Sequence, residues 1–353
     1  MSLNASRTLF PGAMGPDGFI SCFAHLMPEE QIRRCLILKG GPGVGKSTFM
    51  RRIHASLCAG GEASSLYVCS GDPDSLDAVA VPHAGLVVLD GTAPHIVDPR
   101  IPGARDSIIN LGQCLNEEAM RPRLSPIRVC MDDHAACTRR ARSEMRAAAA
   151  IRAECAETIR ACIDERRQAR MTSALIASVL DAPQQAAQPR AVRPVITDAL
   201  TPKGVLCLIG ESAYSRVIRL AVRDLMDAGD VLRRVSAAVS AAGYAVEEHL
   251  SPFLPGSLLH LGIPALDTLI TTSDLIPAEQ TFDLCACLPH AALLRRECAL
   301  EQGAASVRTH TQRAVTALQQ AGQLHDELET FYVPNMDFAR WQQILDETLS
   351  SLA

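Results

Sequence analysis

The sequence has no apolar run of about 18 residues, so it predicts no membrane-spanning helix. Its first residues have neither the basic start nor the apolar stretch of a signal peptide, which favours a cytoplasmic protein. The thirteen cysteines are an odd number and include no CxxC pair of the kind that binds zinc, which is typical of a protein in a reducing compartment. Because 39 acidic residues outnumber 34 basic ones, the net charge of −5 argues against nucleic acid and anionic membranes as partners.

The composition is that of an ordinary folded protein. Apolar residues make up 48% and charged residues 21% of the 353 positions, which at about 150 residues per domain predicts two domains. Lysine is scarce, because only Lys39, Lys46 and Lys203 are lysines among the 34 basic residues. In a chain that otherwise uses arginine, a lysine indicates a position where a compact ammonium is needed.

Residues 40–48 match the GxxxxGKS pattern of a phosphate-binding loop. Residues 35–38 predict a buried strand before this loop, and a helical pattern follows it from Phe49, which is the context that the motif requires. Main-chain N–H groups and the helix N-terminus would face the phosphates, and Lys46 would reach the outer ones. The alternative is a glycine-rich turn before a helix. The predicted nucleotide-binding residues are Gly40, Gly41, Pro42, Gly43, Val44, Gly45, Lys46, Ser47 and Thr48.

A second apolar strand, residues 86–90, ends in Asp90, the candidate that would hold the metal's hydration shell together with Ser47. The expected cofactors are therefore ATP and Mg²⁺, since no NKxD or TKxD stretch argues for guanine. Gly91 stands where many hydrolytic ATPases place a glutamate that polarises water. Hydrolysis, slow turnover and phosphoryl transfer to another acceptor all stay open.

Acidic residues follow a further predicted strand, residues 66–70. Asp72, Asp74 and Asp77 could face a substrate or metal, or they could cap a turn and a short helix. After Asp90, the turn-rich segment 91–100 could act as a switch near the γ-phosphate, with His95 orienting a water. Single loop residues of this kind often have no such role.

An internal repeat appears when the sequence is shifted by 182 positions, and its first part needs a shift of 186. The shift of 182 pairs identical residues, whose first-copy members are Arg34, Leu38, Arg51, Arg52, Ala55, Ala59, Gly61, Ala63, Pro73, Ser75, Leu76 and Pro82. The second copy loses the phosphate loop, because Val222, Asp227, Ala228 and Gly229 replace Gly40, Gly45, Lys46 and Ser47. It also loses the acids at positions 72, 74, 77 and 90, so an active-site role for Asp72 and one of Asp74 or Asp77 stays open beside the capping role.

Helical patterns end each copy. Residues 138–170 carry a near-heptad apolar stripe that predicts a solvated helical hairpin rather than a nucleic-acid arm. In the second copy a similar stripe breaks at Pro334, and Asp337 is expected to cap a final amphipathic helix. A polar, proline-punctuated linker separates the copies. The expected bounds are 1–182 for the first domain, 183–195 for the linker and 196–353 for the second domain.

Several segments are similar to a poorly characterised family of bacterial tandem P-loop ATPase-like proteins. They are residues 39–48, 70–77, 89–99, 102–104, 108–112, 325–329 and 332–338. Of these segments, the Asp-Gly-Thr-Ala-Pro-His run from Asp90 to His95 is the one specific to that family, because the phosphate loop itself is common to the wider superfamily. The resemblance implies nucleotide binding through residues 40–48 and suggests roles for Asp72, Asp90 and His95. The chain departs from the family in its second half, where a phosphate loop is expected and absent.

We therefore expect two α/β, P-loop NTPase-like domains with mainly parallel sheets, each with a helical extension, the second being degenerate. The expected function is Mg·ATP binding with ATP hydrolysis, using Lys46, Asp90, Asp72 and His95 as catalytic residues. The degenerate half could dock against the first and lend an arginine, with Arg216, Arg233 and Arg234 as candidates. A small-molecule kinase with Asp72 as base, and a nucleotide-gated scaffold that recruits a protein partner, are the alternatives.

Overall fold

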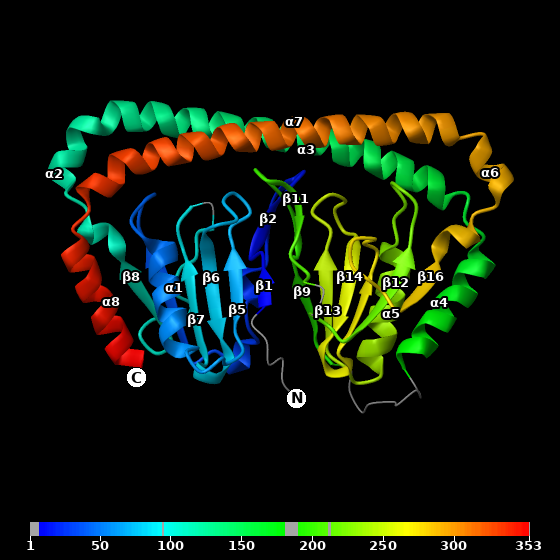
Figure 1. Cartoon of the computed structure of the whole chain (residues 1–353), viewed down its shortest axis with the longest axis horizontal. Helices are drawn as coiled ribbons and strands as arrows, with labels where there is room; N and C mark the ends of the chain where they lie inside the picture. The colour runs from blue at the N-terminus through cyan, green and yellow to red at the C-terminus, as the bar shows by residue number, and fades with distance from the viewer. Residues whose placement is uncertain (1–6, 94, 181–189, 211–212, 353) are drawn as a thin grey trace.

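The computed structural model describes residues 7–93, 95–180, 190–210 and 213–352. Pro94 and residues 183–189 of the expected linker lie outside this range. The molecule is α/β, with two six-stranded sheets side by side beneath a pair of long helices (Figure 1). In the described parts of the chain, no helix combines the length and the apolar content needed to cross a bilayer.

The first sheet has the strand order β1-β5-β6-β7-β4-β8. Only β6 runs antiparallel to its neighbours, and the other pairings are parallel. Apolar side chains of α1, such as Phe49 and Ile53, are buried against one face of the sheet. The elements are β1 (Arg7–Leu9), β4 (Arg34–Lys39), α1 (Lys46–Leu57), β5 (Ser65–Val68), β6 (Leu76–Val81), β7 (Leu86–Asp90), β8 (Asp106–Asn110) and the hairpin β2 (Gly12–Gly15) and β3 (Gly18–Ser21).

The second sheet repeats this plan, with the order β9-β13-β14-β15-β12-β16 and β14 as the antiparallel strand. The structural repeat agrees with the sequence repeat, because β4 and β12 start 182 residues apart and the two hairpins start 186 residues apart. The elements are β9 (Val192–Val195), β12 (Arg216–Ala221), α5 (Gly229–Ala241), β13 (Val246–Leu250), β14 (Leu258–Ile263), β15 (Thr268–Thr271), β16 (Gln280–Asp283) and the hairpin β10 (Asp198–Thr201) and β11 (Gly204–Cys207).

Two long helices span both halves. Helix α3 (Leu124–Arg160) leaves the first half after α2 (Glu117–Met120), and α7 (Glu297–Tyr332) leaves the second after α6 (His290–Leu294). They lie side by side over both sheets (Figure 1), and at about 1.5 Å per residue each is about 55 Å long. Helix α4 (Glu165–Val179) then packs on the second half and α8 (Phe338–Leu352) on the first, so the two halves exchange their last helices.

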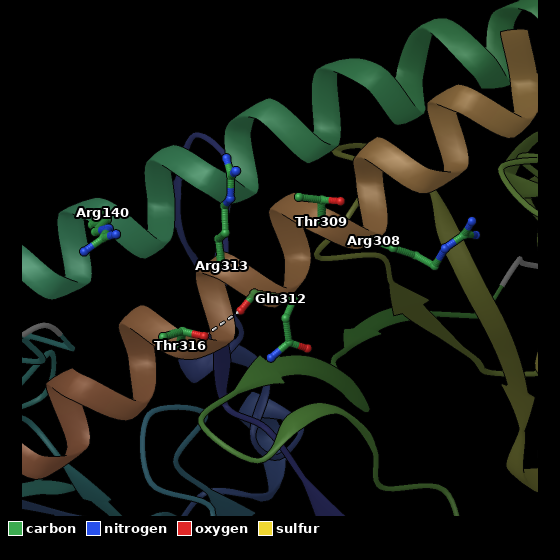
Figure 2. A pocket seen from close by; sticks show the side chains of 6 residues that line it. All are labelled: Arg140, Arg308, Thr309, Gln312, Arg313 and Thr316. Carbon is green, nitrogen blue, oxygen red and sulfur yellow. Dashed lines mark hydrogen bonds between the residues drawn. The ribbon is translucent and has the colours of Figure 1, made fainter.

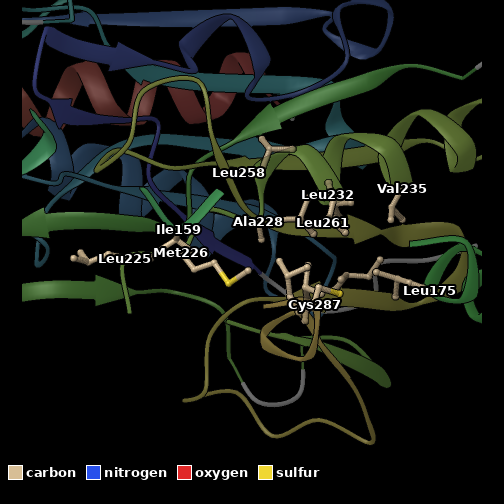
Figure 3. Packing of buried hydrophobic residues seen from close by; sticks show 14 of the residues in the cluster. Ile159, Leu175, Leu225, Met226, Ala228, Leu232, Val235, Leu258, Leu261 and Cys287 are labelled. Carbon is tan, nitrogen blue, oxygen red and sulfur yellow. The ribbon is translucent and has the colours of Figure 1, made fainter. Parts of the chain in front are cut away.

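The exchange is visible in the apolar cores. In the second half, Ile159 of α3 and Leu175 of α4 pack against Leu232 and Val235 of α5 and Leu261 of β14 (Figure 3). In the first half, Trp341 of α8 packs edge-on against Phe49 of α1, with ring centroids 5.6 Å apart. Each half therefore completes its core with a helix that reaches it across the other half.

Two expectations need correction. The stripe over residues 138–170 does not fold back as a hairpin, because α3 pairs with α7 while α4 packs on α5. Residues 192–195, expected to be linker, form β9 and pair with β13. The expectation of mainly parallel sheets is confirmed, with β6 and β14 as the antiparallel strands. The expected cap of α8 is confirmed, since Asp337 Oδ1 accepts a hydrogen bond from the Arg340 N–H.

A buried ion cluster joins the halves. Arg7 of β1 donates to both carboxylate oxygens of Glu247 on β13, at 2.9 and 2.6 Å. Arg193 of β9 donates to the same carboxylate at 2.5 Å and Tyr214 at 3.2 Å. Burial alone would raise the pKa of Glu247, but the hydrogen bonds and charges of the two arginines hold it well below its ordinary value.

Candidate functional site

The 40–48 loop connects the carboxyl end of β4 to the first turn of α1, as the sequence predicts. Gly43 and Gly45 have φ angles of 66° and 80°, in the left-handed region that side chains disfavour. The loop therefore needs glycine at these positions for its turn, independently of any ligand.

The N-terminus of α1 has no capping side chain. Its N-cap, Gly45, offers no side chain, and the first turn contains no acidic residue. The unneutralised positive end of a helix, with its unpaired N–H groups, favours an anion.

The equivalent helix of the second half, α5, has its own anion. Asp227, which occupies the position of Gly45, accepts a hydrogen bond from the Gly229 N–H at 2.9 Å and another from the Ser257 hydroxyl. A carboxylate thus lies where the first half has glycine and no side-chain cap. This contrast makes the N-terminus of α5 less suited than that of α1 to an external anion.

Lys46 and Asp90 come together at the loop. Lys46 Nζ donates to the carbonyl oxygens of Gly40 and Gly41 at 2.9 Å each and lies 3.6 Å from Asp90 Oδ2. Asp90 Oδ1 accepts from the N–H and the hydroxyl of Thr92, at 2.8 and 2.6 Å. Because β4 and β7 pair in parallel, the groups that follow them meet at the carboxyl ends of the two strands.

Ser47 lies in the first turn of α1, where its Oγ accepts a hydrogen bond from the Leu76 N–H at 2.9 Å. A hydroxyl oxygen has a second lone pair, so this contact leaves an acceptor for a cation. The metal ligands expected from the sequence, Ser47 and Asp90, are thus both beside Lys46 at the end of the loop.

Asp72 and Asp74 have other contacts. Asp72 Oδ1 accepts from the Asp74 N–H at 3.3 Å, and Oδ2 accepts from the Ser75 hydroxyl at 2.5 Å. Asp74 is exposed and forms an ion pair with Lys203 of the second half at 2.6 Å. The observed bonds of Asp72 are those of a turn, the alternative that the sequence left open.

His95 and Asp77 pair with each other rather than with the loop. His95 Nε2 lies 3.3 Å from Asp77 Oδ2, and the imidazole packs against the rings of Phe19 and Phe23. The His95 N–H donates to the Thr92 carbonyl oxygen at 2.8 Å, so this pair adjoins the residue that binds Asp90.

The sequence did not assign the residues that cover the loop. A Cβ added to Gly41 would lie 3.1 Å from Tyr332, one on Gly43 would lie 2.9 Å from Val333, and one on Gly45 would lie 3.1 Å from Trp341. Tyr332 is the last residue of α7, Val333 follows it, and Trp341 lies in α8. Residues 332–338 belong to the segments that resemble the tandem P-loop family. That resemblance was the one sequence signal that could have indicated that Tyr332 and Val333 lie near the loop.

Two of the three arginines expected from the second half, Arg216 and Arg233, have partners there. Arg216 donates to the Ser178 carbonyl oxygen at 2.7 Å, and Arg233 lies 3.8 Å from Asp230 on its own helix. Figure 1 shows their elements, β12 and α5, on the opposite side of the molecule from α1.

A cavity of about 540 Å³ lies between the long helices, away from the 40–48 loop. Arg140 comes from α3, and the other lining residues come from α7 (Figure 2). They are Arg308, Thr309, Gln312, Arg313 and Thr316. The cavity is open and basic, and it lacks the acid and the helix N-terminus found at the 40–48 loop.

Comparison of the chain with protein-family models, curated proteins and solved structures finds no significant match. The geometry of the residues therefore carries the functional argument alone.

Proposed function

We propose that the first half binds Mg·ATP through the 40–48 loop and hydrolyses it. The observation that carries this proposal is the uncapped N-terminus of α1, with Lys46 between the loop carbonyls and Asp90 3.6 Å away. Backbone N–H groups, one ammonium and one acid at a strand end are the parts that P-loop NTPases use.

The donor set fits the nucleotide and its metal. The N–H groups of residues 41–45 and Lys46 would hold the β- and γ-phosphates, and Ser47 and Asp90 would hold Mg²⁺ or its water ligands. The bound metal would neutralise charge on the phosphate oxygens. Lys46 would exchange its contact with Asp90 for the phosphates, and Thr92 would keep the Asp90 carboxylate oriented through its two hydrogen bonds.

In hydrolysis, a water oxygen forms a bond to the γ-phosphorus while the bond to the β–γ bridging oxygen breaks, giving ADP and phosphate. His95 and Asp72 are the sequence-based candidates to position that water. His95 adjoins Thr92 through the turn after Asp90, whereas Asp72 uses both carboxylate oxygens within its own turn. The His95 imidazole itself pairs with Asp77, so only the main chain of His95 adjoins the turn after Asp90.

The packing of the C-terminal segment favours a second candidate, a nucleotide-gated scaffold. Tyr332 and Trp341 lie against the loop glycines, and α7 extends from there across the second half. A change at the loop could thus alter the contacts of a helix that spans the molecule. In this alternative, binding without turnover would change how a partner protein docks.

Phosphate release with ATP and Mg²⁺ tests the proposal. We expect turnover by the wild type, its loss in Lys46→Ala, and its retention in Lys203→Ala, a control lysine that pairs with exposed Asp74. Turnover that appears only with an added metabolite pool would support the kinase. Tight ATP binding without phosphate release under any condition would support the scaffold instead.

A further inference from the structure

Three side chains with metal-binding atoms converge beside the 40–48 loop. Cys69 follows β5, Asp77 lies in β6, and His95 lies in the segment after β7. One ligand atom of each residue lies within 4.8 Å of the other two. A thiol, a carboxylate and an imidazole from three separate strands or loops therefore share one small volume.

The imidazole of His95 has a buried polar atom without a partner. Its side chain is 8% exposed and that of Asp77 is 9% exposed. Among the residues that the structure describes, none offers a hydrogen bond to His95 Nδ1. An unsatisfied buried nitrogen costs about 1–3 kcal/mol, so such an atom calls for an explanation.

The sulfur of Cys69 has the surroundings of a ligand. Burial and the nearby charge of Asp77 raise the pKa of the Cys69 thiol well above its ordinary value, while hydrogen bonds from the backbone of Gly71 and Asp72 act in the opposite direction. Hydrogen bonds to sulfur also orient and stabilise a thiolate that binds a metal. Without a cation, the thiol next to Asp77 stays protonated.

The second half shows that the fold does not need these residues. Ser251 replaces Cys69 and Leu259 replaces Asp77, yet the backbone bond from residue 69 to Ser75 recurs from residue 251 to Ser257, both at 3.0 Å. The β-bulge after residue 67 recurs after His249. Ser251 Oγ accepts hydrogen bonds from the N–H groups of Phe253 and Leu254 at 3.3 and 3.1 Å, so this turn forms with a hydroxyl in place of the Cys69 sulfur. Because the fold needs neither that sulfur nor the Asp77 carboxylate, both groups are available for a ligand.

A second cluster of the same residue types provides a contrast. Asp198, Cys207 and His260 also lie within 4.8 Å of one another. There, both ring nitrogens of His260 have partners, Thr271 Oγ1 at 2.8 Å and Asp198 Oδ2 at 2.9 Å. That cluster satisfies its own histidine, whereas the Cys69 cluster does not.

We propose that Cys69, Asp77 and His95 form a binding site for a divalent transition metal, with zinc as the best fit. In a tetrahedral zinc site, bonds of about 2.0–2.3 Å separate neighbouring ligand atoms by about 3.3–3.8 Å, within the spacing seen here. Sulfur and imidazole ligands select zinc over magnesium, so this site differs in chemistry from the oxygen ligands Ser47 and Asp90. Binding releases the thiol proton of Cys69 to solvent, and three protein ligands leave one coordination position open.

Cobalt(II) titration of the metal-free full chain tests the site without nucleotide. We expect a thiolate-to-cobalt charge-transfer absorption in the near ultraviolet, and its loss when zinc is added. Cys69→Ser should abolish the absorption. Cys207→Ser, which removes the sulfur of the contrasting cluster, should retain it.

A wild type without the absorption overturns the proposal, as does its survival in Cys69→Ser or its loss in Cys207→Ser. If circular dichroism shows that Cys69→Ser is unfolded, His95→Gln and Asp77→Asn take its place. Each should weaken zinc binding, measured against a competing chelator, by at least about tenfold. Unchanged affinity in both folded variants would equally overturn the proposal. Because no ATP is present, these outcomes are independent of nucleotide binding at the 40–48 loop.

Discussion

Glu247→Gln is expected to destabilise the whole protein. The Glu247 side chain is 6% exposed, and it holds Arg7 and Arg193 from strands of different halves. Glutamine has nearly the same shape but no charge. The substitution therefore leaves two guanidinium groups close together in a buried site without a counter-ion.

The structure sets the size of this effect. Removing one partner of a buried, hydrogen-bonded ion pair costs about 3–5 kcal/mol. With an unfolding entropy of about 2.1 cal/mol/K per residue over 353 residues, this free energy corresponds to a Tm lowered by about 4–7 °C.

Thermal unfolding followed by circular dichroism measures the change. Glu248→Gln is the matched control, because Glu248 is the next residue of the same strand and is only half-buried. Its Tm should stay within about 1 °C of the wild type, as for surface substitutions worth about 0.5 kcal/mol. Equal Tm values for the wild type and Glu247→Gln would refute the reasoning that this cluster joins the halves.

Three further predictions concern single residues. Trp341→Ala should lower the unfolding free energy by about 3–5 kcal/mol in urea titrations, since it removes the buried ring against Phe49; a loss below about 1 kcal/mol would contradict this packing. Gly45→Ala should lower the unfolding free energy by about 1–2 kcal/mol because the φ of Gly45 is 80°. Gly322→Ala, in open space on α7, should raise it by up to about 1 kcal/mol. A change of the same sign in both variants would contradict this reasoning. The hydrogen bond from Arg105 lowers the pKa of Asp106 from 3.8 to about 2. Its contribution of roughly 2 kcal/mol to the unfolding free energy is therefore present above about pH 4 and is lost as the pH falls towards 2. Asp106→Asn should lack this part of the acid dependence, and parallel profiles of unfolding free energy against pH for the two proteins would rule it out.

The sequence predicted the local elements of the site. Strand 86–90 is found with these bounds, strand 35–38 with one more residue at each end, and the helix after the loop begins at Lys46. These predictions succeeded because short apolar runs bounded by glycine, and a helix with an apolar stripe, depend on neighbouring residues. The prediction of an internal repeat is confirmed because both copies keep the same strand spacing.

The long-range arrangement could not be predicted from one sequence. An apolar stripe on α3 shows which face is buried but not which partner buries it, so the pairing with α7 stayed hidden. Trp341 was predicted only as part of an amphipathic helix, and its place beside Gly45 depends on the exchange of α8 between halves. Asp77 and His95 were separate candidates, and Cys69 was only a strand residue. Their convergence requires the strand register and the turn after Asp90, which no local pattern encodes.

Isothermal titration calorimetry with Mg·ATP tests the central claim most directly. The account predicts saturable binding at one site per chain, weakened about tenfold to a hundredfold in Lys46→Ala, because a charged hydrogen bond is worth about 1.5–3 kcal/mol. Lys203→Ala should bind like the wild type. No heat of binding in the folded wild type, or equal affinity in Lys46→Ala, would contradict nucleotide binding at the 40–48 loop.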